Sequence, residues 1–554
     1  MNTGPLSVAF LLLFSLSIAA QDVESGHAPQ TLQAGTQLVI LDATVYDKQH
    51  QIVVTPLTSD DFEITENNTP QDIRYFESQA DHQAAAAKGE APLIIAILDE
   101  VNFPYNPAAT NADNTEQEVN DYASMRRELL HWLQQQPAQL AGPVEVLALT
   151  HHGYVVVAQA MRNRDLLVDS VSHRDPGLGS PYRDYLEETG GSSGASADHT
   201  STKISLQALW GLGVQERSEP GRKIVLWMGW GGPNLSTQSE PRRGSMLTPS
   251  DIIVRRIRNL LVDARITLDV FTPGIIGAGE PIAGASDDGN RDVAIQSNLV
   301  AYSADLGFSG YVKLTGGRIY TGNDVTGEIA STSNASTRFY TLSYTPKSRI
   351  DDASFRSVRV KVKGHPEWTV ATKAGYYALG VRNARDQEKE ILNDMAVATY
   401  EPMPFSAIDL RLVNVQRLPT SVGDKSAPMA RFTLQADSTN LQWRTDTSTG
   451  ARHADINLSA AALRARPEVL ASRVGEWKLS AHAAGGDHIR TQVAIIVPVP
   501  AKATRVRFVM RDATNGRIGT LEVRSAVLDN APLYVPPVPD LQGHSSATAS
   551  TARP

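Results

Sequence analysis

The hydrophobic pattern of the chain is organised around a short apolar run that ends at two acidic residues. Residues 93–98 are all apolar, and Asp99 and Glu100 follow directly. A continuous apolar run of this length is typical of a strand that is buried on both faces of a parallel sheet. Because ligands bind at the carboxyl edge of an open α/β sheet, we expect Asp99 to lie at such an edge.

Helical and strand patterns alternate from residue 92 to residue 336. Apolar residues at spacings of three and four predict a helix with one buried face over 115–136. Further strands are predicted at 144–150, 154–158, 223–228, 266–271 and 318–321, and further helices at 164–171, 203–214, 250–264, 291–306 and 324–333. This alternation favours an α/β domain with a doubly wound, mainly parallel sheet.

Patterns of period two flank this domain on both sides. Residues 37–78 and 338–380 alternate polar and apolar positions, as half-exposed antiparallel strands do. The first set is too small to fold alone, so we expect the two to pair in a β-sandwich that flanks or encloses the α/β domain. The chain is then predicted to continue as a helical linker at 383–400, a second, C-terminal β-sandwich at 405–528 and a disordered tail at 529–554.

The first twenty residues predict export. Residues 8–18 are mostly apolar, and small residues stand at 17, 19 and 20, as in a signal peptide over 1–20. No Lys or Arg precedes the apolar stretch, so an uncleaved anchor is the alternative. No later stretch offers the roughly 20 consecutive apolar residues that a membrane-spanning helix needs. A periplasmic or secreted location is therefore expected.

Charge and cysteine content narrow the classes of partner and chemistry. The net charge of −9 gives no reason to expect a nucleic-acid partner. The chain contains no cysteine, which excludes disulfides, thiolate zinc sites, cysteine nucleophiles and a lipid anchor on an N-terminal cysteine. Within the printed sequence, the cores alone must then stabilise the fold.

Several residue strings occur in the order in which a known family carries them. They are LVILDATVYDKQHQIVVTPLTSDDFEITENNTPQDIRYF, GRKIVLWMGWGGPN, TGGRIYTGND, FYTLSYTPKSRIDDASFRSVRVKVKG with AGYYAL, and TRVRFVMRDATNGRIGTLEV. Over residues 37–523 the chain thereby resembles the secreted bacterial proteins called von Willebrand factor A-related, which are abundant in acidobacteria. The resemblance implies a von Willebrand A-type domain, and hence a binding module rather than a known enzyme.

The resemblance also implies a metal site that this chain has largely lost. Many von Willebrand A domains hold a divalent metal through an Asp-x-Ser-x-Ser turn, a Thr from another loop and an Asp after the fourth strand. Asp99 matches the first position, but Val101 and Phe103 stand at the two serine positions, and Gly229 stands where the second Asp is expected. Because the number of oxygen ligands decides affinity for such cations, we predict a degenerate site and no cofactor.

A few residues remain as candidates at this edge. Asp99, Asn102 and Thr150 are the oxygen donors that could still hold a divalent metal, and Asp99, Asn102 and Trp230 are the candidates for contact with a partner. Trp230 follows the predicted strand at 223–228 and either contacts a partner or packs under a neighbouring loop. Asp99 either takes part in recognition or caps the turn that follows it.

Other motifs have ordinary structural interpretations. The G-x-S-x-G string at 190–194 lies in a Gly/Ser-rich stretch rather than between a strand and a helix, which argues against a nucleophile elbow. His151 and His152 are read as surface residues of a turn. The oxygen-rich stretches at 111–114 and 287–290 lack the twelve-residue spacing of a calcium loop.

Together these patterns predict an exported, non-enzymatic binding protein. It would recognise a protein or cell-surface partner at the carboxyl edge of the central sheet, without a metal. The alternatives are a structural or envelope-assembly scaffold and, less favoured, a hydrolase whose catalytic motif is not recognised.

Overall fold

The computed structural model of the chain describes residues 38–102, 111–150, 153–174, 194–217, 219–231, 249–272, 308–322, 324–347, 354–378, 384–400, 405, 407–419, 427–437, 441–445, 452–464, 468–481 and 490–534. The predicted signal peptide therefore lies outside the described residues. Among the described residues, no helix has the length and apolar character needed to cross a membrane.

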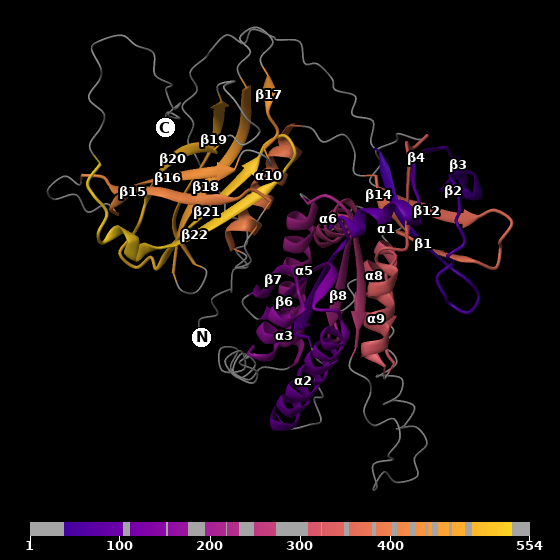
Figure 1. Cartoon of the computed structure of the whole chain (residues 1–554). Helices are drawn as coiled ribbons and strands as arrows, with labels where there is room; N and C mark the ends of the chain where they lie inside the picture. The colour runs from indigo at the N-terminus through magenta and orange to yellow at the C-terminus, as the bar shows by residue number, and fades with distance from the viewer. Residues whose placement is uncertain are drawn as a thin grey trace, which may run out of the picture. The chain divides into compact units, whose positions relative to one another are not determined.

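A six-stranded sheet with helices on both faces forms the centre of the region between residues 93 and 335 (Figure 1). Its strands lie in the order β10-β9-β8-β5-β6-β7, with bounds β5 Leu93–Asp99, β6 Gln139–Thr150, β7 Gly153–Asn163, β8 Lys223–Met228, β9 Ile266–Phe271 and β10 Ile319–Tyr320. The helices are α2 Asn111–Gln135, α3 Arg164–Ser172, α5 Gly194–Arg217, α6 Pro249–Asp263, α8 Ser309–Thr315 and α9 Val325–Ala335.

Alternate residues of the buried strands face two separate cores. Ile94, Ala96 and Leu98 of β5 pack with residues of α2, α3 and α9. Ile95 and Ile97 pack on the other face with residues of α5, α6 and α8. A strand enclosed in this way must be apolar at every position, which explains the continuous run in its sequence.

Two four-stranded sheets share a further core. Their orders are β13-β1-β11-β4 and β14-β12-β2-β3, with bounds β1 Val39–Tyr46, β2 Phe62–Glu66, β3 Thr69–Gln71, β4 Ile73–Glu77, β11 Tyr340–Tyr344, β12 Phe355–Val362, β13 Thr369–Ala371 and β14 Gly375–Tyr377. Strands before the six-stranded sheet in the sequence thus pair with strands after it, as the patterns of period two predict. Helix α1, Gln79–Ala87, and a short 3-10 helix, Ser59–Asp61, complete the N-terminal part.

The C-terminal part begins with helix α10, Ala384–Tyr400, and is otherwise all strand. Its strands are β15 Leu410–Arg417, β16 Met429–Asp437, β17 Arg444–Thr445, β18 Arg452–Leu463, β19 Val469–Ala481, β20 Arg490–Pro498, β21 Arg505–Asp512 and β22 Ile518–Arg524. They form a β15-β16-β20 sheet and a sheet in which β18 pairs with β17, β19 and β21. Residues 529–534 begin the predicted disordered tail, yet Leu533 forms a bridge with Arg417 after the 3-10 helix Ser525–Leu528.

The predicted fold class is wrong. The prediction was a von Willebrand A-type domain with a doubly wound parallel sheet. This domain was expected to be inserted in or flanked by one β-sandwich and to be followed by a second, C-terminal β-sandwich. The described residues instead form a mostly β structure with 22 strands and eight α-helices, and the central sheet is mixed because β7 runs antiparallel to β6. Only residues 151 and 152 separate these two strands, and a parallel crossover requires a dozen or more.

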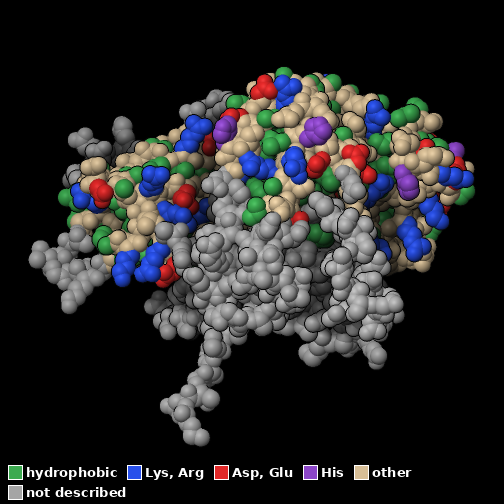
Figure 2. Space-filling model, turned by 90° about the horizontal axis from the view of Figure 1, so that it is seen from below, with side chains coloured by type: hydrophobic (Ala, Val, Ile, Leu, Met, Phe, Trp, Pro, Cys, Tyr) green, Lys and Arg blue, Asp and Glu red, His purple; other side chains and the backbone are tan. Residues whose placement is uncertain are grey.

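Surface charge is mixed on the face drawn in Figure 2. There, Lys and Arg side chains lie among Asp and Glu side chains and exposed apolar ones over the described residues.

Candidate functional site

The strand order places the end of β5 at a topological switch point. Strand β5 pairs in parallel with β6 on one side and with β8 on the other. The chain builds β6 first and then returns to the opposite side of β5 to form β8. The carboxyl ends of β5 and β8 therefore lie side by side where the winding changes direction, which is where open α/β sheets bind ligands.

Asp99 fills this point but directs its carboxylate into the protein. Oδ1 accepts hydrogen bonds from the backbone N–H groups of Val101 and Asn102, both at 3.0 Å. Oδ2 accepts from Nδ2 of Asn102 at 2.9 Å and from Nε1 of Trp227 at 2.7 Å. The side chain is buried, with the residue only 7% exposed. Asp99 thus caps the turn after β5, which is the structural role left open by the sequence.

Asn102 connects this turn to helix α5. Its Nδ2 donates to Oγ of Ser205 at 2.9 Å, and the Ser205 hydroxyl lies 3.2 Å from Oδ1 of Asn102. Both residues are buried. The geometry of the edge therefore depends on the position of α5.

Two carboxyl groups at the edge have raised pKa values. Burial raises the pKa of Asp99, although the donors around it oppose this effect. Burial also raises the pKa of Glu100 to about 7, against the influence of Arg174. The Arg174 guanidinium nevertheless contacts both oxygens of Glu100, with Nη2 at 2.9 and 3.0 Å. The two acidic residues thus differ, since Asp99 shapes the turn and Glu100 is paired with a cation.

Trp230 and Gly229 lie at the end of β8. A Cβ atom at Gly229 would lie 2.7 Å from Cβ of Asp99, so the strand end closes directly onto the carboxylate. Trp230 is buried, with 9% exposed, and its Nε1 donates to Oδ2 of Asp121 in α2 at 2.8 Å. Of the two interpretations of Trp230, these contacts favour packing.

The Thr150 hydroxyl forms a hydrogen bond within the turn between β6 and β7. Thr150 follows Leu149, the residue of β6 that pairs with Asp99. Its Oγ1 donates to the carbonyl oxygen of Gly153 at 2.9 Å, within the turn between β6 and β7. The structure thus brings Asp99 and Asn102 into contact but gives the Thr150 hydroxyl a local backbone partner.

The donor set does not suit a divalent cation. Both oxygens of Asp99 accept protein N–H groups, and neither Val101 nor Gly229 carries a side-chain oxygen. Within the described ranges, no cluster of three or more His, Cys, Asp or Glu side chains has the geometry to hold a metal. Phe103 lies outside the described residues, as do His151, His152 and the stretches at 190–193 and 287–290.

Metal addition is therefore expected to leave the stability unchanged. A ligand that binds only the folded state must raise the melting temperature, Tm. We expect millimolar Mg²⁺, Mn²⁺ or Ca²⁺ to move the Tm of the full chain by less than about 1 °C relative to a chelator. A rise of several degrees with one of these cations in thermal denaturation would contradict this expectation.

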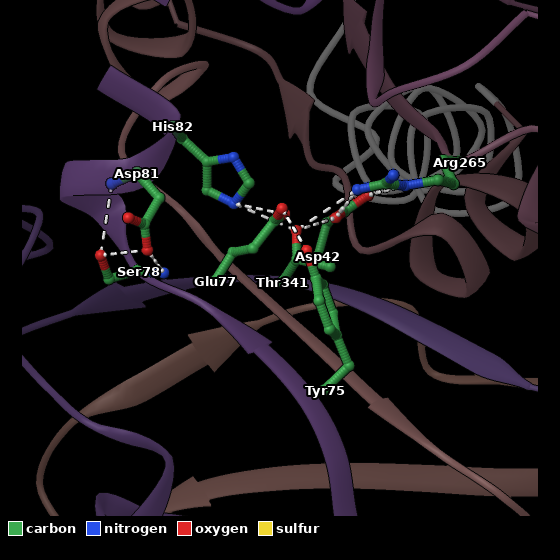
Figure 3. Close-up of polar contacts among 8 residues, drawn as sticks. All are labelled: Asp42, Tyr75, Glu77, Ser78, Asp81, His82, Arg265 and Thr341. Carbon is green, nitrogen blue, oxygen red and sulfur yellow. Dashed lines mark hydrogen bonds and ion pairs between the residues drawn. The ribbon is translucent and has the colours of Figure 1, made fainter. Parts of the chain in front are cut away.

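A second polar cluster lies away from this edge and was not predicted from the sequence (Figure 3). Arg265, the residue before β9, donates to both oxygens of Asp42 in β1, through Nε at 3.1 Å and Nη2 at 2.5 Å. The hydroxyl of Thr341 in β11 donates to Oδ1 of Asp42 at 3.2 Å and lies 3.1 Å from Nε2 of His82 in α1. The cluster thus joins β1, β11 and helix α1 to the residue that precedes β9 of the central sheet.

Arg265 is the cation that pairs with Asp42 in this cluster. Burial acts to raise the pKa of Asp42, but Arg265, Arg222 and the Thr341 hydroxyl together lower it. Burial lowers the pKa of His82, whose nearest carboxylate is Glu77 at 3.7 Å. No local signal could have found this cluster, because Asp42 and Arg265 are 223 residues apart. The only hint is a lone acidic residue inside the apolar pattern of residues 39–45.

Comparison of the chain with protein-family models and with curated proteins finds no match.

Proposed function

We propose that the chain is an exported, non-enzymatic binding protein that recognises another protein or a cell-surface molecule at the carboxyl edge of the six-stranded sheet. The observation that carries this proposal is the switch point between β5 and β8. At such a point the chain leaves two neighbouring strands toward opposite faces of the sheet, which is where open α/β sheets bind ligands. The resemblance to secreted von Willebrand factor A-related proteins also favours binding over catalysis.

Recognition at this edge is proposed to need no metal. In a metal-dependent site, the carboxylate would hold free lone pairs for the cation. Here Asp99 uses its oxygens to hold the turn formed by Val101 and Asn102. The partner would therefore contact the surface that this turn shapes, rather than Asp99 itself.

Trp230 acts as a positioning residue in this proposal. Because its indole is largely buried, it offers little contact area to a partner. Its hydrogen bond to Asp121 holds the end of β8 against α2. Loss of this bond would change the relative position of two elements at the edge.

The test uses proximity labelling in the native cell envelope and compares the partners labelled by the unmodified full chain with those labelled by Trp230 variants. Trp230→Phe keeps an aromatic ring but removes the N–H that Asp121 accepts. Because hydrogen bonds to charged groups contribute about 1.5–3 kcal/mol, we expect labelling of specific partners to fall about tenfold. Trp230→Ala should lose the same partners more completely.

The matched control is Trp368→Phe. Trp368 is a half-buried tryptophan in the connection between β12 and β13, with its ring stacked on His365. This variant should label the same partners as the unmodified chain, and the Tm of each variant establishes that it is folded. If Trp230→Phe and Trp230→Ala both retain every partner, the edge is not the recognition site.

A further inference from the structure

A buried carboxyl group lies at the opposite, amino edge of the same sheet. Glu216 is in the last turn of α5 and is 1% exposed. Its Oε1 accepts a hydrogen bond from Nε2 of Gln215 at 3.1 Å, while no described group hydrogen-bonds to Oε2. An ionised carboxylate with one amide donor is costly in the interior, whereas a protonated carboxyl group is much less so.

The neighbouring cation does not form a direct pair with Glu216. Lys223 begins β8 and is also buried. Its Nζ donates to the backbone carbonyl oxygens of Glu216 at 2.7 Å and Ala264 at 3.3 Å, and also to that of Glu219. These three acceptors match the three N–H groups of an ammonium ion. Burial lowers the pKa of Lys223 to about 8, against the influence of Glu216, so the two groups titrate together.

Other charged groups lie near Glu216. Glu145 faces it from β6 and Glu219 from the α5–β8 connection, and Lys223 is flanked in turn by Arg265 and Asp42. Burial raises the pKa of Glu216 to about 8, and Glu145 and Glu219 act in the same direction against Lys223. Burial likewise raises the pKa of Glu145 to about 7. Two buried carboxyl groups of like charge therefore disfavour each other's ionisation.

Helix α5 connects this group to the recognition edge. Ser205, which contacts Asn102, precedes Glu216 by eleven residues, or close to three helical turns. The two side chains therefore lie on the same face of α5, roughly 16 Å apart along its axis. Leu209 and Leu212 lie between them and are fully buried against the central sheet.

We propose that Glu216 is a proton-binding group that determines how α5 is held on the sheet, and that α5 transmits its protonation to the Ser205–Asn102 contact at the carboxyl edge. When Glu216 loses its proton, the buried charge favours movement of the end of α5 toward water. The Ser205 hydroxyl lies on the same helix face and would move with it. Any effect of this movement on partner binding rests on the proposed function, whereas the link between Glu216 protonation and stability does not.

The sign of the pH effect follows from linkage. The pKa of Glu216 is raised from 4.5 to about 8 in the folded protein, so the folded state binds this proton more tightly than the unfolded state. Its contribution to stability is greatest below pH 4.5 and is lost as the pH rises through about 8. Glu216→Gln imitates the protonated group at every pH and should remove this dependence.

The test measures the Tm of the full chain and of Glu216→Gln at pH 6 and pH 8. Because the loss of stability begins near pH 4.5, the Tm of the unmodified chain should already lie below that of the variant at pH 6, and this difference should widen by roughly 5 °C at pH 8. Taking the difference between the two proteins cancels the contribution of Glu100, whereas Glu145 and Lys223 interact with Glu216 and are part of the same linked titration. The control Glu63→Gln, an exposed glutamate in β2, should follow the unmodified chain.

Hydrogen exchange of the Asn102 amide tests transmission along α5 without any partner. After correction for the intrinsic rate, protection should fall about tenfold more from pH 6 to pH 8 in the unmodified chain than in Glu216→Gln, because the titration of Glu100 is common to both proteins. Parallel Tm values for the two proteins at both pH values would overturn the proton-binding proposal. A pH-dependent Tm difference with the same change in Asn102 protection in both proteins would overturn the transmission. Partner labelling by the Trp230 variants tests the proposed function, whereas the Tm and hydrogen-exchange measurements test the proton linkage. Failure of one proposal is therefore distinguishable from failure of the other.

Discussion

Replacement of Asp99 by alanine is expected to lower the free energy of unfolding by about 3–5 kcal/mol. The substitution leaves four buried donors without their acceptor, namely the backbone N–H groups of Val101 and Asn102, Nδ2 of Asn102 and Nε1 of Trp227. Each buried donor that loses its partner costs about 1–3 kcal/mol, although the surrounding turn can relax in part. Urea unfolding monitored by tryptophan fluorescence would give the change as a shift of the midpoint at constant slope.

The control is Asp60→Ala, because Asp60 is exposed and lies in a 3-10 helix of the N-terminal part. That variant should change the unfolding free energy by no more than about 0.5 kcal/mol. An Asp99→Ala protein as stable as the Asp60→Ala protein would show that the hydrogen bonds of Asp99 do not hold the turn. The large expected effect also means that Asp99→Ala is unsuitable as a probe of partner binding, which is why Trp230 is used for that purpose.

Replacement of Gly229 by alanine is expected to be the second most harmful change at this site. Gly229 has a φ of +149°, a conformation that residues with a side chain rarely adopt, and a Cβ there would lie 2.7 Å from Cβ of Asp99. The backbone strain and the overpacking together should cost about 2–4 kcal/mol in unfolding free energy. Urea unfolding measures this loss directly.

Gly221 separates the two causes. It also has a positive φ, +86°, but a Cβ there would have nothing within 4 Å. Gly221→Ala should therefore cost only the strain, about 1–2 kcal/mol. Equal losses in the two variants would show that contact with Asp99 is unimportant at position 229. A larger loss for Gly229→Ala would show that a side chain at position 229 clashes with Asp99.

The local pattern of the sequence determined where most of the central elements lie. The prediction of a strand at 223–228 matches β8, Lys223–Met228, and the apolar run at 93–98 matches all but the last residue of β5. The helix predicted at 115–136 is found as α2, Asn111–Gln135. These predictions succeed because burial on one or both faces imposes a period that depends only on neighbours in the sequence.

The local pattern could not predict whether neighbouring strands run parallel or antiparallel. The pattern at 154–158 predicted a strand, but its direction depends on the short turn that precedes it and on the partner it finds. The fold class failed for this reason, since a strand's own residues do not encode whether its neighbour is parallel.

The sequence by itself determined that a carboxylate, Asp99, stands at the end of a buried strand. Only the tertiary structure decided its chemistry, because the Trp227 indole that donates to it comes from 128 residues away. The same holds for Glu216, whose like-charged neighbour Glu145 lies on another strand. Burial and hydrogen-bond partners are properties of the assembled fold. They give Asp99 a structural role in place of the predicted ligand contact, and they make Glu216 the proposed proton-binding group.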